Sequence, residues 1–137
     1  MSIFISIVGY RDTELPKTIK SLYDNADKPK ELVFGIVSQD LKACHPNVGW
    51  LGDQAKLYKM HARDAKGAGY ARKIAMELYD GEDYFFQTDS HMRFIQGWDT
   101  KLKDMLLESQ KLSNNKQVIL SQFPAPYTIH SDGKDYY

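Results

Sequence analysis

The amino-acid sequence predicts an α/β protein in which helices cover both faces of a mainly parallel sheet. Apolar runs rich in β-branched and aromatic residues, such as SIFISIVGY at 2–10 and ELVFGIVSQ at 31–39, lack the alternation of a half-exposed strand. Segments with helical spacing of their apolar residues separate these runs. Strands that alternate with helices in this way are typical of parallel sheets covered on both sides.

The elements follow one another without an internal repeat or a domain boundary, so residues 1–137 are predicted to form one domain. In the first helix Leu15, Ile19 and Leu22 share a face, and Pro16 falls in the first turn, where its missing N–H costs little. Residues 40–54 are predicted to form a loop and residues 123–137 an irregular tail. The predicted strands lie at 2–10, 31–39, 56–62, 83–89 and 117–122, and the predicted helices at 12–26, 67–83 and 98–112.

Composition excludes several functional classes. The chain has 137 residues and 42% hydrophobic content, enough for one packed core. Its 18 basic and 18 acidic residues cancel, so neither nucleic acid nor a membrane is an expected partner. Cys44 is the one cysteine, which excludes an internal disulfide and suits a reducing compartment. Without a signal peptide or an apolar run of about 20 residues, we expect a soluble, cytoplasmic protein.

Polar side chains lie at the carboxyl ends of four of the predicted strands. These groups are Tyr10-Arg11-Asp12, Ser38-Gln39, the segment His61 to Arg63, and Asp89-Ser90-His91. In open α/β sheets, ligands bind outside the carboxyl ends of the strands. The sequence therefore predicts that these groups converge on one ligand-binding edge.

Asp89 and His91 are the candidate metal ligands. They are two residues apart at the end of DYFFQTD, so in an extended chain their side chains lie on one side. A carboxylate with an imidazole suits a divalent ion such as Mn²⁺, which leaves coordination positions open for a diphosphate. The alternative is that Asp89 closes a turn and His91 is an ordinary surface residue.

Three further groups are candidates for binding a nucleotide. Gly67 and Gly69 precede a helix whose free N–H groups favour an anion, and Arg72 in that helix can pair with phosphate. The alternative is a glycine turn followed by an ordinary helix with a solvated Arg72. At the end of the first strand, Tyr10, Arg11 and Asp12 can stack on a nucleobase and bond its edge, or Asp12 can cap the helix. Gln39 can bond a base edge or face water.

Four segments together resemble a known family: IFISIVGYRDTELPKTIKSLYDNA, LVFGIVSQ, GAGYARKIAMELYDGEDYFFQTDSHMRFIQGWD and VILSQFPAPY. They are similar to cytoplasmic-type glycosyltransferases that move N-acetylglucosamine from a UDP-sugar, typified by the enzyme that modifies hydroxyproline in a ubiquitin-ligase subunit. The resemblance runs from Ile3 to about Tyr127 in order. GEDYFFQTDSHMRFIQGWD is its most specific part, and it favours the metal interpretation of Asp89 and His91.

The resemblance implies a GT-A fold, which is a Rossmann-like sheet, and a divalent metal, Mn²⁺ or Mg²⁺, held through a D-x-D-like motif. Asp89-Ser90-His91 occupies that motif as D-x-H. The metal ligands would be Asp89 and His91, which would act in catalysis through the metal, with Asp89 also near the ribose or the sugar. The expected nucleotide-sugar-binding residues on this basis are Tyr10, Arg11, Asp12, Gln39, Arg63, Gly69, Arg72 and Asp89.

The expected partners are a UDP-sugar donor and a hydroxyl acceptor. In the GT-A pattern a following half supplies most of the acceptor site and a further metal ligand, so we expect this chain to be the donor-binding half, incomplete at its C-terminus and completed by a following half or a partner chain. One alternative is a non-catalytic UDP-sugar-binding module or a truncated remnant. Another is a nucleotidyltransferase, but VGYRDTELPK lacks the glycine-rich loop of that class.

Overall fold

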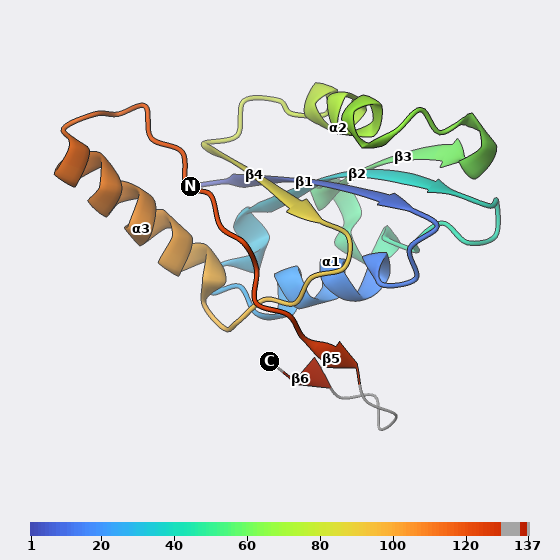
Figure 1. Ribbon diagram of the computed structural model, residues 1–137, viewed down its shortest axis with the longest axis horizontal. Helices are drawn as coiled ribbons and strands as arrows, with labels where there is room; N and C mark the ends of the chain where they lie inside the picture. Colours follow the sequence, from blue (N-terminus) through green and yellow to red (C-terminus); the bar gives the residue numbers. More distant parts are fainter. Residues whose placement is uncertain (130–134, 137) are drawn as a thin grey trace.

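The computed structural model describes residues 1–129 and 135–136 and contains a sheet of four parallel strands in the order β3-β2-β1-β4 (Figure 1). The chain passes from β1 to β2 to β3 in one direction across the sheet, and β4 then lies on the other side of β1. This topology confirms the predicted α/β, Rossmann-like class. The strands are β1 (Ile3–Tyr10), β2 (Leu32–Asp40), β3 (Ala55–His61) and β4 (Tyr84–Asp89).

Helices cover both faces of the sheet, as the sequence predicts. In Figure 1, α2 (Ala68–Glu77) lies over one face and α1 (Leu15–Asp24) over the other, while α3 (Trp98–Ser113) extends beyond the sheet. Short 3-10 turns connect these elements at Pro29–Glu31, Gly49–Gln54 and Ala62–Asp64. Among the described residues, no helix has the length and the apolar character needed to cross a membrane.

The core explains why the central strands show no alternation of polar and apolar residues. Ile5 and Ile7 of β1 pack on one side against α1, where Ile19 and Leu22 are fully or almost fully buried. On the opposite side, Val37 of β2 packs with the small residues of α2. Both faces of β1 and β2 are therefore covered, which is the environment of continuous apolar strands.

The C-terminal part of the chain differs from the prediction. Residues 117–122 do not form a strand, and Ile119 is 91% exposed. The apolar pattern of VILSQ was not sufficient, because a strand also needs a neighbour for its backbone hydrogen bonds, and this segment has none in the described part of the chain. The predicted irregular tail contains instead a small antiparallel pair, β5 (Thr128–Ile129) and β6 (Asp135–Tyr136); residues 130–134 and 137 of that tail lie outside the described residues.

The segment between β4 and α3 is fixed along α1 by side chains of the helix. The hydroxyl group of Thr18 donates to the carbonyl oxygen of Ser90 at 2.7 Å and accepts from the N–H of Met92 at 2.9 Å. Further along, Ser21 Oγ accepts from the N–H of Phe94 at 2.9 Å. These bonds hold the residues immediately after β4 against the start of α1, and they therefore determine where Ser90 and His91 lie.

Gly35 is required by close packing in the centre of the sheet. A Cβ atom at this position would lie 2.2 Å from Cζ of the buried Phe4. We therefore expect Gly35→Ala to lower the free energy of unfolding by about 1–3 kcal/mol, as overpacking in a core does. Urea denaturation of the variant measures this change. Gly69→Ala is the matched control, because nothing lies within 4 Å of its added Cβ, and a loss of stability in the control as large as in Gly35→Ala would contradict the packing argument.

Asp99, in the first turn of α3, is a buried carboxylate that accepts hydrogen bonds from the N–H groups of Asp27 at 2.8 Å and Lys28 at 3.0 Å. Burial raises the pKa of Asp99, but these bonds outweigh it and hold the pKa below its usual value of 3.8. The charged form is therefore favoured in the folded state, and its contribution to stability is lost as the pH falls through the folded pKa.

We expect Asp99→Asn to lower the free energy of unfolding at neutral pH by about 1–3 kcal/mol, as loss of a charged hydrogen-bond acceptor does. The difference from the unsubstituted protein should shrink as the pH falls below about 4, because the carboxyl group then becomes neutral as well. Urea denaturation at several pH values measures both effects. Asp104→Asn, on an exposed position of the same helix, is the control. A difference for Asp99→Asn that is independent of pH would contradict the charge argument.

Candidate functional site at the carboxyl ends of the strands

The carboxyl ends of the four parallel strands lie along one edge of the sheet and bring candidate residues together. Tyr10 of β1 is in register with Gln39 of β2, and Asp40 of β2 is in register with His61 of β3. On the other side of β1, Val8 is in register with Asp89 at the end of β4. The loops after β1 and β4 therefore meet where the strand order reverses, which is the place where open α/β sheets bind ligands.

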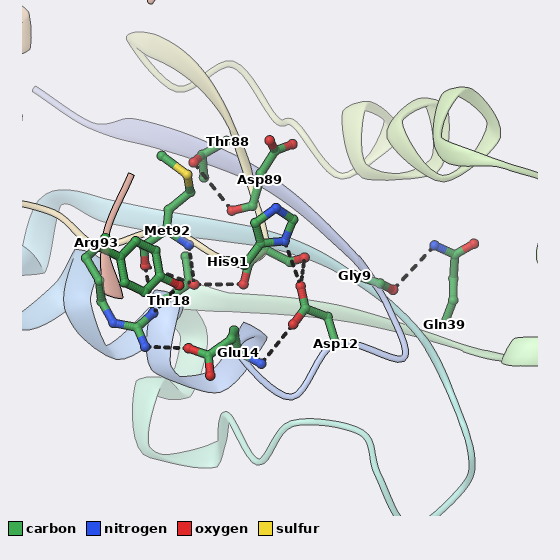
Figure 2. Close-up of polar contacts among 12 residues, drawn as sticks. Gly9, Asp12, Glu14, Thr18, Gln39, Thr88, Asp89, His91, Met92 and Arg93 are labelled. Atoms are coloured by element: carbon green, nitrogen blue, oxygen red, sulfur yellow. Dashed lines mark hydrogen bonds and ion pairs between the residues drawn. The ribbon is translucent and has the colours of Figure 1, made fainter. Parts of the chain in front are cut away.

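Asp12, in the loop after β1, forms the centre of a hydrogen-bonded group that spans this switch point. Its Oδ2 accepts from the hydroxyl group of Ser90 at 2.5 Å and lies 2.9 Å from Nδ1 of His91 (Figure 2). Its Oδ1 accepts from the N–H of Glu14 at 2.9 Å, which forms a turn leading into α1. Partial burial raises the pKa of Asp12, but the bonds from Ser90, Glu14 and His91 outweigh it, so the pKa lies below its usual value.

Asp89 and Arg72 form an exposed ion pair beside this group. An Nη atom of Arg72, on α2, lies 3.4 Å from Oδ1 of Asp89, and the two side chains are 40% and 54% exposed. Exposed pairs of this kind contribute about 0–1 kcal/mol. The pair therefore adds little to the stability of the fold, and both groups remain accessible to a ligand.

Two side chains at this edge, those of Asp89 and His91, are the candidates for holding a metal. Asp89 offers an exposed carboxylate, and His91 has an exposed ring whose Nδ1 is hydrogen-bonded to Asp12, so Nε2 is the ring nitrogen left for a metal. Among residues 1–129 and 135–136, no group of three or more His, Cys, Asp and Glu side chains is arranged to hold a metal. Asp89 and His91 alone would supply two protein ligands, and phosphate oxygens and water would have to complete the coordination of an ion held there.

A pocket of about 220 Å³ lies on the other side of Asp12, between the ends of β1 and β2. Arg11 and Asp12 form one wall, and Ser38 and Cys44 contribute to the wall on the side of β2. Ser38 is buried and its Oγ lies 2.8 Å from Nδ1 of His45, which ties residues 40–46 to the strand. The remaining residues that line the pocket are Gly9, Thr13, Leu15, Pro16, Asp40, Leu41 and Pro46.

Two backbone and side-chain features stand out at the ends of β1 and β2. Arg11 has a φ of 47°, an uncommon conformation for a residue with a side chain, and its N–H donates to the carbonyl oxygen of Gln39 at 3.0 Å. The buried side chain of Gln39 donates through Nε2 to the carbonyl oxygen of Gly9 at 3.3 Å (Figure 2), while its Oε1 is a buried acceptor without a donor in the described part of the chain. A buried acceptor without a donor lowers the free energy of unfolding by about 1–3 kcal/mol.

Other predicted site residues lie at the same edge but make local contacts. The ring of Tyr10 is exposed at the end of β1. Arg63 follows β3, is strongly exposed, and has its Nε 3.9 Å from a carboxylate oxygen of the neighbouring Asp64. Gly69 is the second residue of α2 and has open space around it. The structure therefore pairs Asp12 with His91 and Arg72 with Asp89, and leaves Tyr10, Arg63 and Gly69 around these two pairs.

Sequence reasoning missed the residues that support the site. Ser90 occupies the middle position of the D-x-H motif, where alternation along a strand predicts a side chain turned away, but the chain leaves β4 at Asp89 and Ser90 bonds Asp12. Glu14 and Arg93 form a close ion pair, and the Arg93 side chain is almost fully buried and also lies 4.8 Å from the ring centre of Tyr127. The two partners are 79 residues apart, so no local pattern indicates their contact.

Comparison with known families identifies the class of protein. The family described as "Glycosyltransferase (GlcNAc)" matches the chain over residues 2–49 and 41–137. The chain therefore belongs to this glycosyltransferase family. No curated protein and no solved structure matches it.

Proposed function

We propose that this chain binds a UDP-sugar, UDP-N-acetylglucosamine or a close relative, and takes part in metal-dependent transfer of the sugar to a hydroxyl acceptor. The observation that carries the proposal is the position of Asp89 and His91. Both side chains are exposed where the strand order reverses, and the cationic side chain of Arg72 lies next to Asp89. The chain that carries them belongs to a glycosyltransferase family.

In this proposal each polar group contacts a different part of the UDP-sugar. Asp89 and His91 hold Mn²⁺ or Mg²⁺, and Arg72 pairs with the diphosphate by charge-assisted hydrogen bonds. The base lies at the ends of β1 and β2 near Arg11, with the exposed ring of Tyr10 as a stacking surface. Gln39, in register with Tyr10 on the neighbouring strand, is assigned to the edge of the base. Arg63 and Gly69 lie farther along the diphosphate and the sugar.

The chemistry follows from the charge that develops when the bond between sugar and phosphate breaks. The leaving group is UDP, and its β-phosphate oxygen gains negative charge as the bond to the sugar carbon lengthens. A bound divalent ion supplies electrostatic stabilisation of that charge. Arg72 adds a fixed cationic donor at the same edge, where groups held in place before the reaction stabilise the transition state without reorganisation.

Selectivity for the nucleotide tests this proposal. With saturating Mn²⁺, calorimetric titration should show that UDP-N-acetylglucosamine and UDP bind, whereas GDP-mannose does not, because Gln39 is assigned to the edge of uracil and guanine presents a different set of donors and acceptors there. Replacement of Gln39 by Leu should weaken the binding of UDP and leave the binding of Mn²⁺ unchanged. Equal affinities for UDP-N-acetylglucosamine and GDP-mannose would contradict the assignment of the ends of β1 and β2 to uracil.

A further inference from the structure

We propose that Asp12 is a positioning residue for His91. Its carboxylate holds the imidazole in the tautomer with the proton on Nδ1, and so presents Nε2 to the ligand edge. This role differs from the direct contact with the nucleotide that the sequence predicts for Asp12. The metal part of the inference rests on the proposed function, whereas the tautomer of His91 does not.

The hydrogen bonds of Asp12 leave its carboxylate little capacity for a ligand. Oδ1 accepts from the N–H of Glu14, and Oδ2 accepts from the hydroxyl group of Ser90 and faces Nδ1 of His91. The Asp12 side chain is only 18% exposed, whereas that of His91 is 62% exposed. The carboxylate is thus held on the protein side of the ring, and the ring is the group that faces solvent.

The chemistry of a neutral imidazole then assigns the proton. A neutral histidine ring carries one N–H, and the ring nitrogen beside a carboxylate must be the donor, because a carboxylate only accepts. With the proton on Nδ1, the lone pair of the ring lies on Nε2, which points away from Asp12 in Figure 2. Carboxylates that accept from metal-binding histidines fix the tautomer and orientation of the ring in this way.

The bond also joins two loops that belong to different parts of the chain. Asp12 follows β1, and His91 follows β4, 79 residues later. Ser90 donates to the same oxygen at 2.5 Å, and its own carbonyl oxygen is held by Thr18 of α1. Asp12 therefore positions His91 across the switch point, and Ser90 helps to hold the carboxylate in place.

The tautomer can be measured without metal by two-bond ¹H–¹⁵N correlation spectra of protein labelled at histidine, at about pH 8.5, where ordinary histidines are neutral. The His91 ring should carry its proton on Nδ1. His61 provides an internal reference of the opposite kind, because its Nδ1 accepts from the N–H of Arg63 at 3.1 Å and its proton must then be on Nε2. The His91→Gln spectrum assigns the signals of His91.

Asp12→Ala should move the His91 proton to Nε2 and weaken Mn²⁺ binding in the presence of UDP by about 10- to 100-fold, the usual cost of losing such a partner. The electron paramagnetic resonance signal of free Mn²⁺ measures that affinity. Ser90→Ala is the matched control. It removes one donor to Asp12 and leaves the contact with His91, so we expect the tautomer to be unchanged and the affinity to fall less than in Asp12→Ala.

The possible results separate this inference from the proposed function. A proton on Nε2 of His91 in the unsubstituted protein, or an unchanged Mn²⁺ affinity in Asp12→Ala, overturns the inference. If the tautomer depends on Asp12 but Mn²⁺ and UDP do not bind the unsubstituted protein, the positioning role stands and the proposed metal site fails. If Asp12→Ala does not fold, the tautomer of His91 in the unsubstituted protein remains the deciding measurement, and a proton on Nε2 overturns the inference.

Discussion

Asp89→Asn is expected to abolish the Mn²⁺-dependent binding of UDP while the fold is retained. The substitution removes a negatively charged metal ligand. Loss of a residue that only hydrogen-bonds a metal ligand already lowers metal affinity by up to about 100-fold, so we expect the affinity for UDP in the presence of Mn²⁺ to fall by at least ~100-fold. The fold should tolerate the change, because the Asp89 side chain is 54% exposed at the end of β4 and contacts Arg72 in a weak pair.

Calorimetry with Mn²⁺ and UDP measures the affinity of the Asp89→Asn variant, and urea denaturation checks its stability. Asp104→Asn is the matched control, since it makes the same chemical change at an exposed position on α3, away from the edge of the sheet. Its affinity should equal that of the unsubstituted protein. Equal affinities for UDP and Mn²⁺ in Asp89→Asn and in this control would show that Asp89 is not a metal ligand.

Arg72→Ala should separate the phosphate from the rest of the nucleotide. Charged hydrogen bonds contribute about 1.5–3 kcal/mol, so loss of the pair with phosphate should lower the affinity for UDP by roughly 10- to 100-fold. Binding of uridine, which has no phosphate, should not change. Binding of Mn²⁺ alone should stay the same or become slightly tighter, because the substitution removes a positive charge 3.4 Å from Asp89.

Titrations of UDP, uridine and Mn²⁺ into the Arg72→Ala variant provide the three comparisons. Lys73→Ala is a suitable control, because Lys73 is the next residue on α2 and lies 4.0 Å from Glu77 rather than at the edge of the sheet. Equal losses of affinity for UDP and uridine in Arg72→Ala would show that the arginine acts on the whole nucleotide or on the fold, and not on phosphate.

The fold of the first two-thirds of the chain could be predicted because its signals are local. The apolar runs at 2–10 and 31–39 became β1 and β2 because both of their faces are covered, and Pro16 lies in the first turn of α1 as predicted. The run at 117–122 has a similar composition but no strand beside it in the described part of the chain. A strand depends on its neighbour, and that neighbour cannot be read from the segment itself.

The candidate site shows the same division between local and distant signals. The position of Asp89 and His91 at a strand end follows from the sequence pattern alone. The contact of Asp12 with Ser90 and His91 does not, because it depends on the register of β1 with β4 and on the bonds that hold residues 90–94 along α1. The roles of these residues toward a UDP-sugar remain predictions, as do the GT-A fold, the acceptor and the cellular location.

The central claim is that a divalent metal at Asp89 and His91 is needed to hold a UDP-sugar. Calorimetric titration of UDP into this chain, first with Mn²⁺ and then with EDTA, tests it most directly. Saturable binding with Mn²⁺ that disappears with EDTA is the result we expect. Binding of equal strength in both conditions, or no binding with Mn²⁺, would contradict the account.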